Sequence, residues 1–216
     1  MSINRTYAVF GLGRYGRAVA EELVKSGAEV IAIDENEEYV NDACAVIPIC
    51  KCADITDPEV NEKLGISSVD VVIVAMASNL EASVMAVTLC KEVGVPMVIA
   101  KCSNEMHQKI LSRVGADRVV FPEKESGTRL AKNILSSGFA DLIELSDDVS
   151  MVEMDVKPDW EGKTLLQLDL RKKYSMNVVA IRKGGTVVTD IDPQMPLDKE
   201  MKLIVIANVA KLKKLK

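Results

Sequence analysis

The chain has 216 residues, of which 48% are hydrophobic and 27% are charged, a composition typical of a folded protein and not of a disordered one. The 27 basic and 32 acidic residues give a net charge of −5, which argues against a nucleic-acid-binding protein, because such proteins usually carry a basic surface. No stretch reaches the roughly 18 uncharged apolar residues that a membrane-spanning helix needs, so we expect a cytoplasmic protein.

The first predicted element is a short apolar strand from Thr6 to Phe10, which ends in a glycine motif. Gly11, Gly13 and Gly16 have the spacing G-x-G-x-x-G, and residues with helical apolar spacing follow at once. In such a motif the first glycine makes the turn, the second lets a pyrophosphate approach the backbone, and the third lets the helix pack on the strand. The N-terminus of that helix binds phosphates through its free N–H groups and its dipole. The motif therefore predicts a nucleotide site.

The second predicted strand, residues 29–33, ends on Asp34, which lies 18 residues after Gly16. An acidic residue at this place accepts hydrogen bonds from the ribose hydroxyls of a bound nucleotide. A second interpretation is that Asp34 caps the helix that begins near Asn36, and this role is compatible with ribose binding. A carboxylate here also repels a 2′-phosphate, so we expect NADP to be disfavoured.

Strands and helices then alternate as far as residue 121. Alternation over some 120 residues implies a doubly wound, Rossmann-like parallel sheet with helices on both faces. We therefore assign residues 1–121 to a nucleotide-binding domain. Beyond the first two strands, its predicted strands are 46–49, 69–75, 97–100 and 118–121, and its predicted helices after the first are 37–43, 56–64, 79–92 and 104–114.

After residue 121, the regular alternation of predicted strands and helices ends. Helical spacing continues from Pro122 to about Ser137, and we assign residues 122–144 to crossover helices. Residues 145–216 are predicted to form a small α+β domain, which is too small to be the substrate domain of a usual dehydrogenase. Its expected elements are a strand at 150–156, a turn into a short helix at 160–168, a hairpin of 177–182 with 186–189, and a last strand at 203–207.

Ligands of such sheets bind outside the carboxyl ends of the strands. Asp54 follows the third strand and is placed to accept a hydrogen bond from an adenine amino group, while the small side chain of Ala75 leaves room for the nucleotide. Lys101 follows the fifth strand and is either a ligand or a simple strand-end charge. The full set of expected nucleotide-binding residues is Gly11, Gly13, Arg14, Tyr15, Gly16, Asp34, Glu35, Ala53, Asp54, Ala75, Lys101 and Glu123.

Two charged residues set this site apart from a plain dinucleotide turn. Arg14 lies between the second and third glycines, where its guanidinium would contact phosphate oxygens, an arrangement more useful to a polyphosphate than to a bridged pyrophosphate. Glu123 begins a helix beside the same site and would hold Mg²⁺ or another divalent ion. The alternatives are an exposed loop arginine and a carboxylate that stabilises the helix dipole.

Groups suited to catalysis are scarce. The only histidine, His107, lies on a predicted helix with no nucleophile or carboxylate arrangement nearby in the sequence. A hydride-transfer enzyme needs an acid or base in its substrate pocket, and none is evident. We therefore predict that the chain is not an enzyme, with a small NAD-dependent oxidoreductase as the alternative.

Several segments together resemble one family. They are the glycine motif with Asp34, Val71–Ala75 followed by Asn79–Ser83, the segment Val114–Lys124, and the trailing small domain. The chain is similar over nearly its whole length to the RCK (regulator of potassium conductance) family, and most similar to its Ktr-type cytosolic subunits, which are related to the Trk potassium-uptake regulators.

The resemblance implies an octameric ring of dimers that binds a membrane potassium channel or transporter and gates it according to bound ATP or ADP, with NAD(H) as another possible ligand. It implies that Arg14 contacts the terminal phosphate, Asp34 the ribose, and Glu123 a Mg²⁺ or Ca²⁺ ion, and that residues 122–144 dimerise. In some relatives the last domain binds cyclic di-AMP. Here the family's usual Gly-Asp before the final strand is replaced by Glu200-Met201-Lys202.

Overall fold

The computed structural model describes residues 5–135, 139–146 and 148–208. The chain divides into two compact units, Met1–Lys124 and Glu125–Lys216, and each is treated by itself below. In the described part, none of the helices combines the length and the apolar character that crossing a membrane requires.

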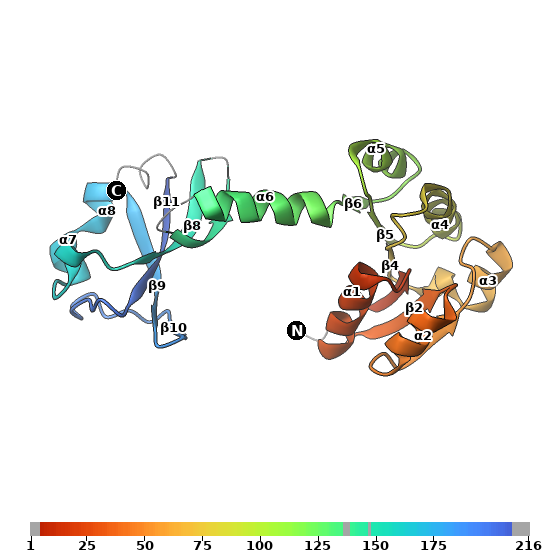
Figure 1. Ribbon diagram of the computed structural model, residues 1–216, viewed down its shortest axis with the longest axis horizontal. Helices are drawn as coiled ribbons and strands as arrows, with labels where there is room; N and C mark the ends of the chain where they lie inside the picture. The colour runs from red at the N-terminus through yellow and green to blue at the C-terminus, as the bar shows by residue number, and fades with distance from the viewer. Residues whose placement is uncertain (1–4, 136–138, 147, 209–216) are drawn as a thin grey trace. The chain divides into compact units, whose positions relative to one another are not determined.

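The first unit is built on a sheet of six parallel strands in the order β3-β2-β1-β4-β5-β6 (Figure 1). The order reverses between β1 and β4, and this is the point at which doubly wound sheets bind ligands. The expected Rossmann-like fold is thus confirmed. The strands are β1 (Thr6–Phe10), β2 (Glu29–Asp34), β3 (Ile49–Cys52), β4 (Val71–Val74), β5 (Met97–Lys101) and β6 (Arg118–Val120).

Helices cover both faces of this sheet because its strands are apolar on both sides. One core packs Ala20 of α1 and Val40 of α2 against Val9 and Ile73 of the sheet. The other packs α4 and α5 against the opposite face, around Phe10. The helices are α1 (Arg14–Lys25), α2 (Glu37–Cys44), α3 (Pro58–Lys63), α4 (Leu80–Glu92) and α5 (Glu105–Arg113), with a 3₁₀ turn, η1 (Ile66–Ser68).

Short polar residues fix where these helices begin. The side chains of Asn36, Asp57, Asn79 and Asn104 each accept a hydrogen bond from a backbone N–H in the first turn of α2, α3, α4 and α5, respectively. Such caps satisfy donors that would otherwise lack a partner, and each is typically worth about 1 kcal/mol. Asn36 lies two residues after the end of β2, so its cap fixes the start of α2 close to the carboxyl end of that strand.

The third strand differs from its prediction. Residues 46–49 were expected to form it, but the structure places β3 at Ile49–Cys52. The N–H groups of Val46 and Ile47 donate to the Ala43 carbonyl, so these residues close α2 and are not available for the sheet. Pairing with β2 begins only where Ile49 lies opposite Ile31.

The second unit contains an antiparallel sheet in the order β10-β9-β11-β8-β7. Trp160 is 2% exposed at the centre of its core, with Leu203 and Val205 of β11 packed in the same cluster. The expected small α+β domain is confirmed. Its elements are most of α6 (Pro122–Leu135), whose first residues belong to the first unit, β7 (Phe139–Glu144), β8 (Val149–Asp155), η2 (Pro158–Trp160), α7 (Leu165–Leu168), α8 (Leu170–Tyr174), β9 (Met176–Lys183), β10 (Thr186–Val188) and β11 (Lys202–Asn208).

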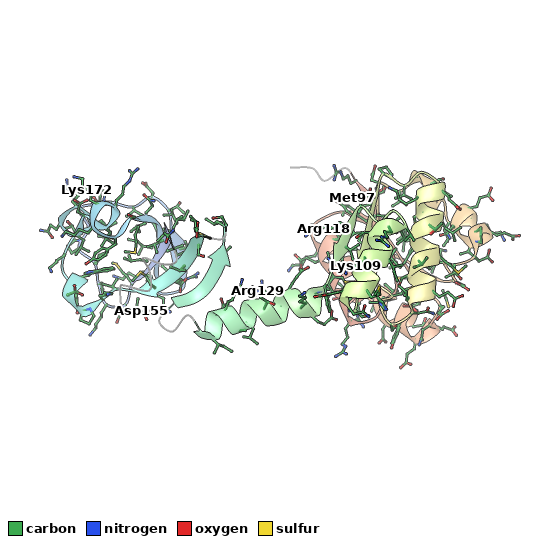
Figure 2. All side chains as sticks on the ribbon, turned by 90° about the horizontal axis from the view of Figure 1, so that it is seen from above. Met97, Lys109, Arg118, Arg129, Asp155 and Lys172 are labelled. Atoms are coloured by element: carbon green, nitrogen blue, oxygen red, sulfur yellow. The ribbon has the colours of Figure 1, made fainter. Side chains whose placement is uncertain are left out.

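The segment expected to hold crossover helices is helical only in its first part. The helix α6 ends at Leu135, and residues 139–144 form β7, which pairs with β8. The expectation of helices through residue 144 is therefore corrected, because these residues pair with β8 as the edge strand of the sheet. Along α6 itself, the apolar residues Leu130 and Ile134 are exposed. The charged Arg129 is also exposed (Figure 2).

Candidate functional site: a nucleotide cleft at the sheet switch point

A cavity of about 470 Å³ lies at the carboxyl ends of β1, β2, β3 and β4. This is the position at which the sequence places the nucleotide, and it lies at the reversal of strand order. The cavity is lined by Gly11, Gly13, Asp34, Glu35, Asn36, Tyr39, Ala53, Asp54, Ile55, Thr56, Ala75, Met76, Ser78, Asn79 and Ala82.

Glycine stands at each of the three positions of the motif for a different physical reason. Gly11 has φ +91°, a conformation that residues with a side chain rarely adopt. A Cβ at Gly16 would overlap the carbonyl oxygen of Gly11, so only glycine lets α1 pack this closely. Gly13 has an ordinary φ of −61° and no protein atom within 4 Å of where its Cβ would lie. The protein itself does not require glycine at 13, whereas a phosphate approaching the backbone would.

Asp34 is held by the turn that it faces. The backbone N–H of Leu12 donates to Asp34 Oδ2 at 2.5 Å, and that of Asn36 donates to Oδ1 at 2.8 Å. A carboxylate has about four acceptor positions, so both oxygens can still accept from ribose hydroxyls. The alternative that Asp34 caps α2 is wrong, because Asn36 is the cap and Asp34 only accepts from the N–H of that residue.

Asp54 lines the other wall of the cavity. Its Oδ1 accepts hydrogen bonds from the Thr56 hydroxyl at 2.6 Å and from the Thr56 N–H at 2.9 Å. These bonds lower the pKa of the Asp54 carboxyl, first through the hydroxyl and then through the backbone, and they outweigh the opposing effect of burial. Asp54 is thus an ionised acceptor near neutral pH, as recognition of an amino group requires.

A second cavity of about 370 Å³ adjoins the first. It is lined by Gly13, Arg14, Tyr15, Ala75, Ala77, Ser78, Lys101 and Glu123, and it shares Gly13, Ala75 and Ser78 with the larger cavity. A single elongated cleft therefore runs from Asp54 and Asp34, past the glycine turn, to the charged residues 14, 101 and 123.

The far end of the cleft carries two cations and one anion. Lys101 Nζ lies 2.7 Å from Glu123 Oε1 and 5.4 Å from the centre of the Tyr15 ring. The hydrogen bond from Lys101 is the largest cause that lowers the pKa of the Glu123 carboxyl, and Arg14 adds a smaller electrostatic contribution. Arg14 is exposed and forms no ion pair with any residue that the structure describes. Its guanidinium is therefore available to phosphate oxygens.

Glu123 offers a divalent ion only one carboxylate. Among the described residues, no three His, Cys, Asp or Glu side chains are grouped so that they could hold a metal. Mg²⁺ is commonly bound by one or two carboxylates together with substrate phosphates and water, so the donor chemistry fits an ion shared with a nucleotide and not a cage made by this chain.

The structure brings eleven of the twelve expected site residues to the cleft, and Gly16 is the exception because it is buried inside the turn. His107 lines neither cavity; its Nδ1 lies 2.9 Å from the Ser103 hydroxyl. Sequence reasoning missed some lining residues, although a Ser-Asn pair directly before α4 signalled a polar helix start at a strand end. The missed polar residues are Asn36, Tyr39, Thr56, Ser78 and Asn79.

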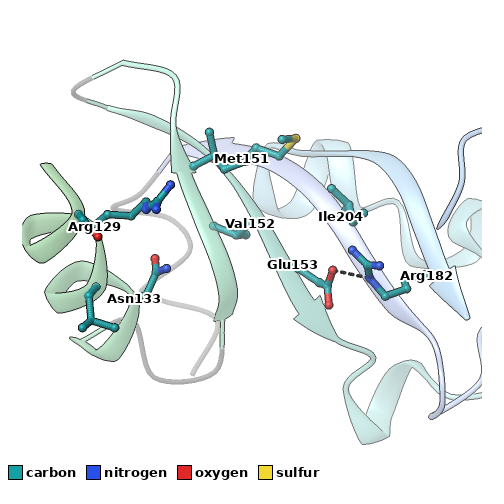
Figure 3. Close-up of a pocket in the computed structure, with 10 residues that line it drawn as sticks. Arg129, Asn133, Met151, Val152, Glu153, Arg182 and Ile204 are labelled. Carbon is teal, nitrogen blue, oxygen red and sulfur yellow. Dashed lines mark hydrogen bonds and ion pairs between the residues drawn. The ribbon is translucent and has the colours of Figure 1, made fainter. Parts of the chain in front are cut away.

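The second unit has a cavity of its own, of about 610 Å³, between α6 and the β8–β11 part of the sheet (Figure 3). Glu153 is 8% exposed there and accepts a 2.8 Å hydrogen bond from Arg182 Nε, with Lys202 Nζ at 3.6 Å. The remaining walls include Met151, Ile204 and Arg129. The buried carboxylate is thus already neutralised by residues of the sheet.

Two family models match the chain. The TrkA-N domain matches residues 7–122, and the TrkA-C domain matches residues 149–216. The Ktr system potassium uptake protein C of Bacillus subtilis (strain 168) is 38% identical over 207 residues, which cover 96% of this chain and 94% of that protein. The Ktr system potassium uptake protein A of the same organism is 32% identical over 211 residues, covering 98% and 95%.

Solved RCK structures share the fold. The GsuK channel has a TM-score of 0.68 at 17% identity and is matched over 100% of this chain and 39% of its own. The GsuK channel bound to NAD has a TM-score of 0.64 at 16% identity, with coverages of 98% and 39%. At this identity the likeness concerns the fold alone, while the family models and the sequence relatives extend over both units. The chain belongs to the RCK family and carries a TrkA-N domain followed by a TrkA-C domain.

Proposed function

We propose that this chain is a nucleotide-binding regulatory subunit that controls a membrane potassium channel or transporter according to whether ATP or ADP is bound. The observation that carries the proposal is the continuous cleft, with Asp34 and Asp54 toward one end and Arg14 at the other. We propose that the first end takes the nucleoside and the second the phosphates. Similarity to two Ktr system potassium uptake proteins over nearly the whole chain supports the link to potassium transport.

The cleft suggests how the two nucleotides are told apart. ATP and ADP make the same contacts at Asp34 and at the glycine turn, but they differ by one phosphate at the end that holds Arg14, Lys101 and Glu123. A Mg²⁺ ion held by Glu123 and the phosphates would supply further positive charge there. A ligand shifts a conformational equilibrium only by its differential affinity for the two states. These three residues are therefore the proposed origin of regulation.

Regulation also requires assembly and a partner. We extend the proposal to a ring of dimers, an octamer, that joins in part through α6, whose exposed Leu130 and Ile134 suit a contact between subunits. The ring acts at the cytoplasmic side of the membrane subunit and has no catalytic role. The cleft supplies binding groups, and His107 does not line it.

NAD(H) is the second candidate ligand. The turn G-x-G-x-x-G with an acid at the end of β2 also suits a dinucleotide, and a solved RCK channel of the same fold is described as bound to NAD. The open space at Gly13 accepts a pyrophosphate as readily as a triphosphate. Arg14 favours ATP, because a bridged pyrophosphate has no terminal phosphate to offer it.

A thermal-shift panel tests the proposal. The full chain is heated with ATP, ADP, NAD⁺ and NADH, each with and without Mg²⁺. A ligand at 100 times its dissociation constant stabilises the folded state by about 2.7 kcal/mol, which is enough to rank the panel. We expect ATP and ADP to give the largest shifts. If NADH gave the largest thermal shift, NAD(H) would replace ATP and ADP as the proposed ligand. If no ligand shifted the melting temperature, nucleotide binding would be overturned.

A further inference from the structure

The ion pair between Lys101 and Glu123 occupies the place that a nucleotide's terminal phosphate and its cation would share. Lys101 ends β5, Glu123 lies in the first turn of α6, and the pairing of Lys101 with Val120 across β5 and β6 brings the two together. The Lys101 side chain is only 16% exposed, whereas that of Glu123 is 63% exposed. The lysine is thus fixed between Tyr15 and the carboxylate, and the carboxylate faces the cleft.

This arrangement has a direct electrostatic consequence. A polyphosphate that enters the cleft meets the positive charge of Arg14 and Lys101 but also the negative charge of Glu123. As long as Lys101 is paired with Glu123, the ammonium group is not available to a phosphate. The neutralised carboxylate is then also a poor ligand for a divalent cation. A phosphate oxygen within reach of Lys101 competes with Glu123 for the same ammonium group.

We propose that Lys101 is an exchangeable counterion that couples the terminal phosphate to a divalent cation. Without nucleotide, Lys101 pairs with Glu123. When a terminal phosphate occupies the cleft, the ammonium turns to the phosphate, and Glu123 becomes available as a cation ligand. This inference rests on the proposed nucleotide-binding function. It attributes the coupling between nucleotide and cation to the exchange in which Lys101 leaves Glu123 for the phosphate.

The inference predicts opposite effects for the two members of the pair. In buffer with EDTA, isothermal titration with ATP should show about tenfold weaker binding for Lys101→Met, because a charged contact to phosphate is lost. Glu123→Gln should bind ATP more tightly than the wild-type chain, by about threefold or more, because Lys101 is then free and the repulsion is removed. If the ion pair had a purely structural role, the two substitutions would both weaken ATP binding, or neither would.

The chain offers a matched control. Lys124 Nζ and Glu105 Oε1 form another 2.7 Å ion pair, but neither residue lines the cleft. Lys124→Met and Glu105→Gln should leave ATP affinity unchanged. Circular dichroism at 25 °C verifies that each variant is folded, and Lys101→Gln replaces Lys101→Met if the latter is not.

Titration with Mn²⁺ alone gives an independent readout. Without nucleotide, Lys101→Met should bind Mn²⁺ more tightly than the wild type, because Glu123 has lost its internal cation, and Lys101→Met with Glu123→Gln should abolish the gain. The inference would be overturned if wild type and Lys101→Met bound Mn²⁺ equally well. It would also be overturned if Lys101→Met and Glu123→Gln changed the ATP affinity in the same direction. Neither result would contradict nucleotide binding. A wild-type chain that binds no ATP would overturn the proposed function itself.

Discussion

The backbone N–H of Leu12 donates a 2.5 Å hydrogen bond to Asp34 Oδ2 and so connects the glycine turn after β1 to the carboxylate that ends β2. The parts of the cleft that are proposed to bind the phosphates and the ribose are therefore connected to each other in the chain without ligand. Such preorganisation lowers the entropy that binding must offset. Under the proposed function, Asp34 thus both binds the ligand and positions the glycine turn.

Asp34→Ala should reduce nucleotide affinity by about 10- to 100-fold, because a charged hydrogen-bond acceptor is typically worth about 1.5–3 kcal/mol. Isothermal titration with ADP measures the loss, since ADP contacts this end of the cleft in the same way as ATP. Asp42→Ala is the control, because Asp42 is an exposed acid on α2 that lies outside the cleft. Unchanged ADP affinity in Asp34→Ala would contradict ribose binding at this residue.

Substitutions at Gly13 and Gly16 should separate the effect on ligand binding from the effect on the stability of the fold. A Cβ at Gly16 overlaps the Gly11 carbonyl, so Gly16→Ala should lower the free energy of unfolding by about 1–3 kcal/mol. Gly13→Ala creates no contact within the protein and should cost less than about 1 kcal/mol. It should nonetheless weaken nucleotide binding by about tenfold, because the new methyl group occupies the approach of a phosphate.

Urea unfolding and titration with ATP, carried out on both variants, measure these effects. Equal losses of stability in Gly13→Ala and Gly16→Ala would show that the turn, and not the ligand, requires both glycines. Full ATP affinity in Gly13→Ala would place the phosphates elsewhere.

Asp70 should make the first unit sensitive to acid. The N–H of Thr6 donates to Asp70 Oδ2 at 2.8 Å, and its hydroxyl does so at 3.1 Å; these bonds lower the pKa of the carboxyl below its ordinary value of 3.8. The ionised form therefore stabilises the folded state above that value, and the contribution is lost as the pH falls through the lowered folded-state pKa. Asp70→Asn should be less stable than wild type at pH 7, and the difference should shrink at pH 3.

Urea titrations at the two pH values check this expectation. Lys25→Gln, which removes one member of an exposed pair on α1, provides a variant whose effect should be small at both. A stability difference for Asp70→Asn that stays constant or grows toward pH 3 would contradict the assigned role.

Glu153 should stabilise the second unit through its two cations. Its side chain is 10% exposed, and removing its charge leaves Arg182 and Lys202 without their shared partner, so Glu153→Gln should cost about 1–3 kcal/mol. Asp155→Asn is the matched control, because Asp155 also contacts Lys202, at 3.7 Å, but is 75% exposed and should contribute less than about 0.5 kcal/mol.

The single tryptophan makes this measurement specific. Trp160 is buried in the core of the second unit, so its fluorescence during urea unfolding follows that unit. Equal midpoints for the two variants would show that burial of Glu153 adds nothing to its ion pairs.

The sequence predicts the fold well where periodicity and local chemistry agree. The glycine turn, the acid at the end of β2 and the starts of the helices predicted from 79 and 104 are local signals, and the structure forms the corresponding elements. The cleft is predictable because parallel strands deliver their carboxyl ends to one edge. These signals are strong because each depends on only a few neighbouring residues.

Other features depend on partners distant in the sequence. The strand β3 was predicted three residues too early, because the apolar residues Val46 and Ile47 form the turn that follows α2, and only their hydrogen bonds reveal this. The strand β7 was missed because its assignment depends on pairing with β8. The Lys101–Glu123 pair joins residues 22 positions apart, and nothing in the local pattern of either residue indicates the other.

Discrimination between ATP and ADP at Arg14 is the central claim, and isothermal titration of both nucleotides with Mg²⁺ tests it most directly. The ratio of their affinities is measured for wild type, for Arg14→Ala and for Arg113→Ala, which removes an exposed arginine at the end of α5. The account predicts that Arg14→Ala brings the ratio at least about threefold closer to one, while Arg113→Ala leaves it unchanged. An unchanged ratio in Arg14→Ala, with both nucleotides bound, would contradict the claim.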